Sequence, residues 1–483
     1  MRKYIIIILS IALLGLTACT EDILDRINKD RQNPSPDVVP AYLQLSDAIM
    51  ATGFSTVSGD YAFYLASLNE QSVGIGNNQL MEAELRNSNQ WASSTTFNNV
   101  WNSTYGNLKN IREIIRKVEN EVPLNIGQYH LLGMAQVLEA LNFGVLTDMH
   151  GDIPYSEALQ GQVNLQPKLD AQEAVYAGIL ATLDAAIANF NKGGAMTNAQ
   201  KGQDIAFGGN VTQWKATAYA LKARYLLHKL AVEPGVLAQV ETNALEAVEL
   251  GFEGFTVDLF NGVTVDNPWS AFVFSRLYTA PSVTVTNLME AEDDPRLDLY
   301  LNARGESYEP GDEVIARTVD NNGARQPGWY LYGSQPMHLF SKSELYFILA
   351  EAQLRLDKDA TTAFQTAVET SVSEILDWFD EDASVASGFA ESLGTPTLQM
   401  LFEQKYIAQS LDEQVETYND FRRLKAMGES YVELTNPWNT QSGINRYPER
   451  LPYGNSAVLG NPNIKEAYGD GFYIYSQKTW VNN

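Results

Sequence analysis

The chain has 483 residues, and its 59 acidic against 33 basic side chains give a formal net charge of −26 at pH 7. A surface this acidic repels phosphate backbones and anionic lipid headgroups, which argues against a nucleic-acid partner and against membrane binding through a basic face. The length suffices for one large or several ordinary domains, and the 24 Tyr, 19 Phe and 8 Trp suit both core packing and flat ligand-binding surfaces.

The first 18 residues have the pattern of a secretory signal peptide: a basic start, an apolar run too short to span a bilayer, and small residues. Leu16-Thr17-Ala18-Cys19 resembles the bacterial lipobox, whose cysteine becomes the lipidated first residue of the mature protein. Cys19 is the only cysteine in the sequence, so no intrachain disulfide explains it. The alternative is a signal-peptide cysteine without a role. We expect a signal peptide over 1–18 and membrane attachment through a lipid at Cys19 alone, because no later apolar run approaches the roughly 20 residues of a spanning helix.

Residues 19–40 are expected to form an acidic, proline-rich tether, since Asn33-Pro34-Ser35-Pro36 and Pro40 disfavour both helix and sheet. Glu21, Asp22 and Asp25 directly follow the cysteine. They resemble the signal that exports Bacteroidetes lipoproteins to the cell surface; a solvated linker is the alternative.

Residues 41–483 are expected to form a single, mainly helical domain. Apolar residues recur at three- and four-residue steps in most of it, as on the buried face of an amphipathic helix. Two segments, Asp170 to Glu173 and Ser341 to Glu344, have the spacing of a capping box. The predicted helices cover about 97–118, 129–146, 170–190, 212–230, 237–249, 341–356, 361–379, 395–410 and 412–427.

The helical period disappears over about 251–335, where Gly, Asn, Pro and aromatic residues dominate and short pieces such as Val283-Thr284-Val285-Thr286 favour strands. An irregular segment of this length inside a domain is usually functional. The helical pairs on either side, with Ala216, Ala220 and Ala223 forming a small-residue edge, suggest tetratricopeptide-like hairpins.

Catalysis has little support in the sequence. It contains no nucleophile elbow, no zinc-binding His-Glu-x-x-His pair and no phosphate-binding glycine loop. His130 and His150 lie on adjacent segments, but satisfied or exposed histidines are the simpler explanation. A carboxylate pair for glycoside hydrolysis has no sequence signature and stays open. The acids of the 292–298 segment could hold Ca²⁺, although a solvated acidic turn explains them better. We therefore predict no catalytic residue, no metal and no cofactor.

The loop aromatics suggest ligand binding, because a sugar ring can lie on the plane of a Trp or Tyr side chain while amide and charged side chains form hydrogen bonds with its hydroxyl groups. Trp101, Trp214 and Trp378 fall on predicted helices and are expected in the core. The alternative for the loop aromatics is that they pack the loops onto the helices. The candidate ligand-binding residues, all in irregular regions, are Trp91, Trp269, Trp329, Tyr330, Tyr332, Asn69, Gln71, Asn78 and Arg276.

Motifs in a fixed order resemble those of the SusD/RagB family of nutrient-binding lipoproteins of Bacteroidetes. Gly454 and Ala457 depart from the usual residues of the last motif. The matching segments are Gly151-Asp152-Ile153-Pro154-Tyr155 with Glu157-Ala158, Lys168 to Ala186, Trp214 to Arg224, Asp294-Pro295-Arg296-Leu297, Glu344 to Ala352, Asp420-Phe421-Arg422-Arg423 and Arg450-Leu451-Pro452-Tyr453.

The resemblance implies a helical fold of tetratricopeptide-like units with a loop-rich ligand face. It implies a lipoprotein of the outer membrane, at the cell surface, that captures oligosaccharide or peptide, does no chemistry, and serves a SusC-like TonB-dependent transporter in polysaccharide utilisation. The alternative function is a tetratricopeptide-like scaffold that binds peptides or a partner protein at the outer membrane.

Overall fold

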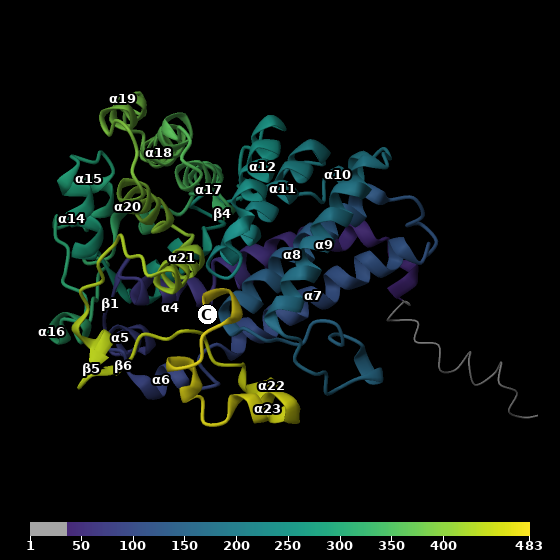
Figure 1. Ribbon diagram of the computed structural model, residues 1–483, viewed down its shortest axis with the longest axis horizontal. Helices are drawn as coiled ribbons and strands as arrows, with labels where there is room; N and C mark the ends of the chain where they lie inside the picture. Colours follow the sequence, from purple (N-terminus) through teal and green to yellow (C-terminus); the bar gives the residue numbers. More distant parts are fainter. Residues whose placement is uncertain (1–35) are drawn as a thin grey trace, which may run out of the picture.

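The computed structural model describes residues 36–483 (Figure 1). The predicted signal peptide, Cys19 and most of the predicted tether lie outside the described residues. Among the residues described, no helix combines the length and apolarity needed to cross a bilayer.

Long helices make up most of the fold, as the apolar periodicity predicts. They are α7 (Asn98–Glu119), α8 (Tyr129–His150), α9 (Gln172–Asn191), α11 (Val211–His228), α12 (Leu237–Glu249), α17 (Lys342–Arg355), α18 (Thr361–Trp378), α20 (Leu398–Gln409) and α21 (Gln414–Met427).

Shorter helices occur between and after them. These are α3 (Leu45–Ala51), α4 (Asp60–Leu68), α5 (Gln79–Glu84), α6 (Ser88–Ala92), α10 (Asn198–Lys201), α13 (Pro268–Arg276), α14 (Val283–Ala291), α15 (Leu297–Tyr300), α16 (Glu313–Ala316), α19 (Val385–Ser392), α22 (Asn455–Gly460) and α23 (Pro462–Tyr468).

The strands of residues 36–483 form three two-stranded antiparallel ribbons, of which two join segments far apart in the sequence and the third is a local hairpin. They pair β1 (Val73–Gly74) with β3 (Thr279–Ala280), β2 (Phe255–Val257) with β4 (Met337–Phe340), and β5 (Thr440–Gln441) with β6 (Ile444–Asn445).

The long helices pack as successive neighbours: α7 on α8, α8 on α9, α9 on α11, α11 on α12, α12 on α17, and α17 on α18 and α20. This is the predicted arrangement of helical hairpins, and in Figure 1 it runs from the right of the molecule over the top to the upper left. Several short elements, α5, α16, β1, β5 and β6, occupy the lower left, while α22 and α23 lie at the bottom. The chain therefore joins a helical frame to an irregular face.

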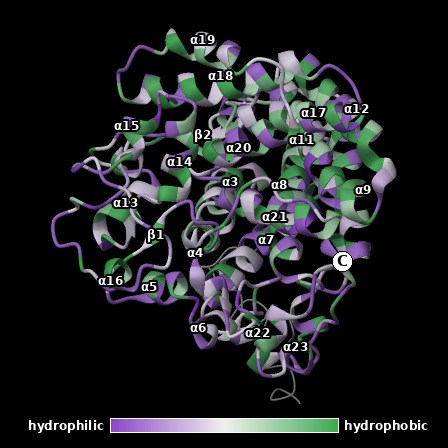
Figure 2. Cartoon of the chain, turned by 60° about the vertical axis from the view of Figure 1, so that its left-hand side comes forward, coloured by the Kyte–Doolittle hydropathy of each residue, from purple (hydrophilic) through white to green (hydrophobic). Residues whose placement is uncertain are grey.

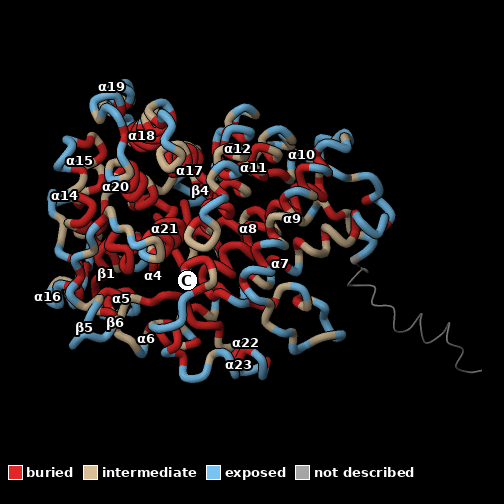
Figure 3. The backbone as a smooth tube through the Cα atoms, in the orientation of Figure 1, coloured by how far each residue is buried: buried red, intermediate tan, exposed pale blue. Residues whose placement is uncertain are grey.

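A continuous core connects the two parts, with buried apolar residues from Ala41 to Val481 (Figure 3). Ala216, Ala220 and Ala223 of α11 are all buried, as the small-residue edge predicts. Close helix contact also depends on glycine in α8, because a Cβ on Gly144 would collide with the Tyr225 hydroxyl. Backbones that approach this closely leave no room for larger side chains.

Charged side chains are also buried between the long helices. Arg224 of α11 forms an ion pair with Glu344 of α17, and its Nη1 lies 3.6 Å from Oε1 of Glu416 on α21. His228 reaches the same Glu416 at 2.9 Å. Burial disfavours the charged forms of these groups, but each charge lies beside an opposite charge that stabilises it. For Glu416 the attraction outweighs the effect of burial, because Arg224 and His228 lower its pKa to about 2. The network fixes α11, α17 and α21 relative to one another.

Local structure differs from the sequence prediction in two places. Residues 283–286 begin α14 and form no strand, because the Ser282 hydroxyl caps that helix by accepting from the Thr284 N–H. Asp170 does not cap α9, which starts at Gln172; its carboxylate accepts from the N–H groups of Tyr155 and Ser156. At α17, in contrast, the Ser341 hydroxyl accepts from Glu344 N–H, which is the first half of the predicted capping box; the Ser341 N–H donates instead to Glu413.

Candidate ligand-binding face

Most of the candidate ligand residues are buried. At most 1 % of the surface of each is exposed, so a ligand could not reach them. The expectation that they line a site is therefore wrong for these residues. They agree with the alternative, in which the loop residues pack the loops onto the helices. The six buried residues are Trp91, Trp269, Trp329, Tyr330, Asn69 and Gln71.

The buried amides connect the segment after α4 to the last long helices. The Asn69 side chain donates to the carbonyl of Gln414 at 2.9 Å. The Gln71 side chain donates to the carbonyl of Tyr406 at 3.2 Å and to the Thr417 hydroxyl at 2.9 Å. Their polar atoms are therefore occupied by the fold.

A stack of aromatic rings lies beneath α13. Trp269 and Tyr330 are stacked with centroids 4.7 Å apart, and Phe63 of α4 meets the edge of Trp269 at 4.7 Å. Phe272, half-buried, stacks on Phe63 with centroids 3.8 Å apart and an angle of 11°. These rings anchor one side of α13 to the core.

The other side of α13 faces solvent, and Phe274 is 74 % exposed there. The start of the helix is well defined, because the Asn267 side chain caps it by accepting from Trp269 N–H and Pro268 occupies the first turn. It ends at Leu277, which takes a left-handed conformation with φ of 57°. The chain thereby presents an aromatic ring outward from a rigid helix, as a flat ligand surface requires. Figure 2 shows α13 at the left of the molecule.

Two loops border α13. The β1–β3 pairing continues in a hydrogen bond from Ile75 N–H to the Tyr278 carbonyl, 2.8 Å, which brings Tyr278 beside the loop after β1. Asn78 lies in that loop, half-buried, and its side chain accepts from Leu80 N–H and donates to the Ile75 carbonyl. Its amide therefore caps α5 and shapes the loop.

The second loop, residues 320–326, is fastened from within. Asp320 accepts from the backbone N–H of Arg325 at 3.0 Å and from the Gln326 amide at 3.1 Å. Burial would raise the pKa of Asp320, but these hydrogen bonds lower it. Gln326 in turn accepts from the Thr279 hydroxyl of β3 at 2.8 Å. We call the surface formed by Phe272, Phe274, Arg276, Tyr278 and this loop the α13 face.

Arg276 is the candidate residue that the structure leaves on the exposed surface of this face. Within residues 36–483 it makes no hydrogen bond or ion pair, so its five N–H donors are open to a ligand. Tyr332, also a candidate, is half-buried and packs against Phe379 with centroids 5.0 Å apart. Phe274 and Arg276 are therefore both exposed on α13, but they leave opposite sides of the helix because they are two residues apart.

Asp294 of the acidic segment and His150, both considered from the sequence, are buried in the structure. In the described part of the chain, no three His, Cys, Asp or Glu side chains gather as metal ligands do. Asp294, from the acidic segment considered for Ca²⁺, is buried and paired with Arg296 at 2.5 Å. His150 lies in the core, where burial lowers its pKa to about 3, and hydrogen-bonds to Tyr61.

The sequence analysis missed Phe272, Phe274 and Tyr278. The sequence does contain a pattern that could have identified the exposed ring. Asn267-Pro268 is a typical helix start, and in a helix that begins there positions 269, 272 and 273 share one side while position 274 faces away from it.

Comparisons with known proteins add a family and a fold. A family model described as starch-binding and associating with the outer membrane matches residues 60–454. A SusD/RagB family protein of Bacteroides thetaiotaomicron is 31 % identical, with a TM-score of 0.81 over 92 % of this chain and 99 % of that one.

Two similar structures carry a ligand in their names. A chitin-binding protein is 21 % identical, with a TM-score of 0.70 over 93 % of this chain and 100 % of its own. A chitin-binding SusD homologue of Flavobacterium johnsoniae is 19 % identical, with a TM-score of 0.61 over 88 % and 98 %. No match was found among curated proteins.

Proposed function

This chain belongs to the SusD-like family, and from that premise we propose that it binds an oligosaccharide on the α13 face and passes it to a SusC-like transporter of the outer membrane. The observation that carries the proposal is Phe274, an exposed ring on a helix anchored by a buried aromatic stack.

Ring stacking and directed hydrogen bonding are both available on this face. The ring of Phe274 offers an apolar plane for the C–H face of a sugar. Arg276 lies two residues further along the helix and so leaves it on the other side, where its unpaired guanidinium can donate to another part of a longer glycan. The names of the relatives, starch-binding for the family and chitin-binding for two structures, support a glycan as the ligand class. The protein acts by binding, with no chemical step.

Phe274→Ala is the experiment that tests the proposal. Titration calorimetry with maltohexaose and with a chitin hexasaccharide should show about tenfold or greater weakening for this variant, because loss of a stacked ring removes about 1–3 kcal/mol. Phe472→Ala is the matched control, since Phe472 is also an exposed ring, at 43 %, but belongs to the C-terminal segment. Its affinity should equal that of the unchanged protein.

Equal affinity in the Phe274 and Phe472 variants would show that the ligand does not bind at the α13 face. Heat with peptides and none with any sugar would favour instead the scaffold that binds peptides or a partner protein.

Attachment to the membrane is a separate part of the proposal and concerns Cys19. A lipid on this cysteine would hold the protein at the outer membrane, because buried acyl chains contribute about 0.8 kcal/mol per CH₂. Cys19→Ala should move the protein from the membrane fraction to the soluble fraction in cell fractionation. Retention of the variant in the membrane fraction would contradict lipid anchoring.

A further inference from the structure

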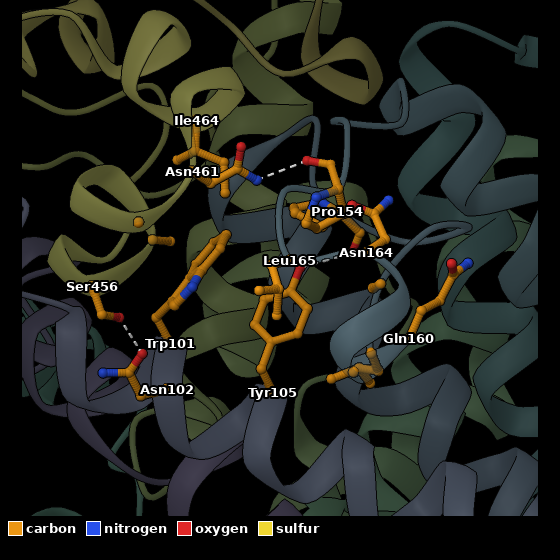
Figure 4. A pocket seen from close by; sticks show the side chains of 16 residues that line it. Trp101, Asn102, Tyr105, Pro154, Gln160, Asn164, Leu165, Ser456, Asn461 and Ile464 are labelled. Atoms are coloured by element: carbon orange, nitrogen blue, oxygen red, sulfur yellow. Dashed lines mark hydrogen bonds between the residues drawn. The ribbon is translucent and has the colours of Figure 1, made fainter.

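A groove of about 370 Å³ lies between α7, the loop over residues 154–167, and the C-terminal helices α22 and α23 (Figure 4). It shares no residue with the α13 face, and in Figure 2 the C-terminal helices lie at the bottom of the molecule while α13 lies at the left. Its volume falls in the range of small-molecule sites. The residues on which the argument depends are Asn102 and Tyr105 of α7, Gln160 and Leu165 of the loop, and Ser456 and Asn461 of the C-terminal wall.

The walls of the groove are held together by hydrogen bonds across a long stretch of sequence. The Asn461 amide of the C-terminal wall donates to the Pro167 carbonyl of the loop at 2.7 Å, and Asn463 donates to the Gln166 carbonyl at 3.1 Å. At the base, the Tyr105 hydroxyl donates to the Pro154 carbonyl at 2.8 Å. A ligand therefore meets a groove that is already formed.

The middle of the groove is apolar. Figure 4 shows Trp101 and Tyr105 side by side on α7, their rings 5.0 Å apart, with Leu165 of the loop beside Tyr105. Trp101 is only 3 % exposed and supports the wall, so the half-buried Tyr105 is the ring that a ligand can reach. Trp101 cannot turn away, because the His150 ring meets it edge-on at 4.9 Å and the Gly454 backbone lies against it. Leu165 is 75 % exposed and adds apolar surface to the open side of the groove.

Polar groups lie at the two ends of the groove (Figure 4). At one end Asn102 accepts from the Ser456 hydroxyl, and its own NH₂ has no partner in residues 36–483. At the other end the exposed Gln160 amide makes no side-chain hydrogen bond within the same range. These amides can donate and accept at once, which suits hydroxyl groups.

The lining contains no charged side chain, in a protein whose net charge is −26. A charged ligand would find no counter-charge here, and a purely apolar one would make no use of the two exposed end amides. A neutral sugar has an apolar face for the rings and hydroxyls for the ends. We propose that the groove is a second binding site, for one or two neutral sugar units of the glycan; this rests on the proposed function for the ligand class and not on the α13 face.

The test removes the end amides. The variant N102A/Q160A is compared with N99A/Q162A, whose two amides are exposed on the same helix and the same loop but do not line the groove. Both pairs are placed in the Phe274→Ala protein, so that binding at the α13 face does not mask the groove. Calorimetry with maltohexaose and chitin hexasaccharide should show residual binding that N102A/Q160A weakens about tenfold and N99A/Q162A leaves unchanged.

A second variant, Ala457→Phe, places a ring in the groove without removing a polar group and should abolish the residual binding, with the fold checked by circular dichroism. If Phe274→Ala already abolishes all sugar binding, the groove proposal is overturned while the proposed function stands. If the groove variants weaken binding and Phe274→Ala does not, the groove stands and the α13 face is refuted. If no sugar binds to the unchanged protein, both proposals fail.

Discussion

At the scale of single residues, aromatic side chains have two separate tasks around α13. Trp269, Trp329 and Tyr330 are buried and support the helix, whereas Phe274 points to solvent. The sequence predicted the region that bears the rings but could not tell the supporting rings from the exposed one. Which side of a helix is buried depends on what packs against it, here Phe63 from residues far back in the chain.

Trp269→Ala is therefore expected to destabilise the fold. Removing a fully buried indole from between Phe63 and Tyr330 leaves a cavity, and such changes typically cost about 3–5 kcal/mol. Urea unfolding followed by circular dichroism measures the loss.

Trp269→Phe is the matched control for that experiment. It keeps a ring in the stack and removes an indole N–H that has no hydrogen-bond partner in the described residues, so its cost should be well under that of the alanine variant. The unchanged protein and the two variants would contradict the prediction if their unfolding free energies agreed within 0.5 kcal/mol, which is about the effect of a surface change. The aromatic stack would then contribute nothing to stability.

At the scale of elements, the long helices could be predicted because their apolar period is set by burial of one side against a neighbour. α7, α8, α9 and α11 begin and end within a few residues of the predicted bounds. Short elements could not be predicted as well. The β-branched run at 283–286 became the first turn of α14, since a serine cap and the packing of that helix outweigh a weak strand preference.

The family motifs themselves describe the fold more than the ligand. Arg224 of one motif forms a buried ion pair with Glu344 of a second. Glu351 of that second motif forms another with Arg423 of a third, at 2.6 Å. These residues set how the helices meet, so they identify the family from sequence. They say nothing about the surface that contacts a ligand, which explains why the fold could be predicted and the site residues could not.

At the scale of the whole molecule, the buried charges couple stability to pH. His228 lies between Asp148 and Glu416 and is only 5 % exposed. Burial alone would lower its pKa, but the two carboxylates raise it from 6.5 to about 9. The folded protein therefore keeps a proton that the unfolded chain loses above pH 6.5. The stabilisation is complete below that pH and declines as the pH rises towards 9.

His228→Gln should flatten this part of the stability profile. For the unchanged protein the free energy of unfolding should fall by about 3 kcal/mol between pH 6.5 and 9 from His228 alone, with a further decline from His338, whose pKa Asp412 and Glu374 raise against the effect of burial. Urea unfolding at pH 6.5, 7.5, 8.5 and 9 measures the slope. The variant should start less stable and lose only the part due to His338.

His130→Gln provides the control, because burial lowers the pKa of that half-buried histidine and so places its titration below pH 6.5. Its slope between pH 6.5 and 9 should match that of the unchanged protein. An equally steep decline in the His228 variant would mean that the imidazole is neutral between its two carboxylates, and that the charge balance joining α8, α11 and α21 has been assigned incorrectly.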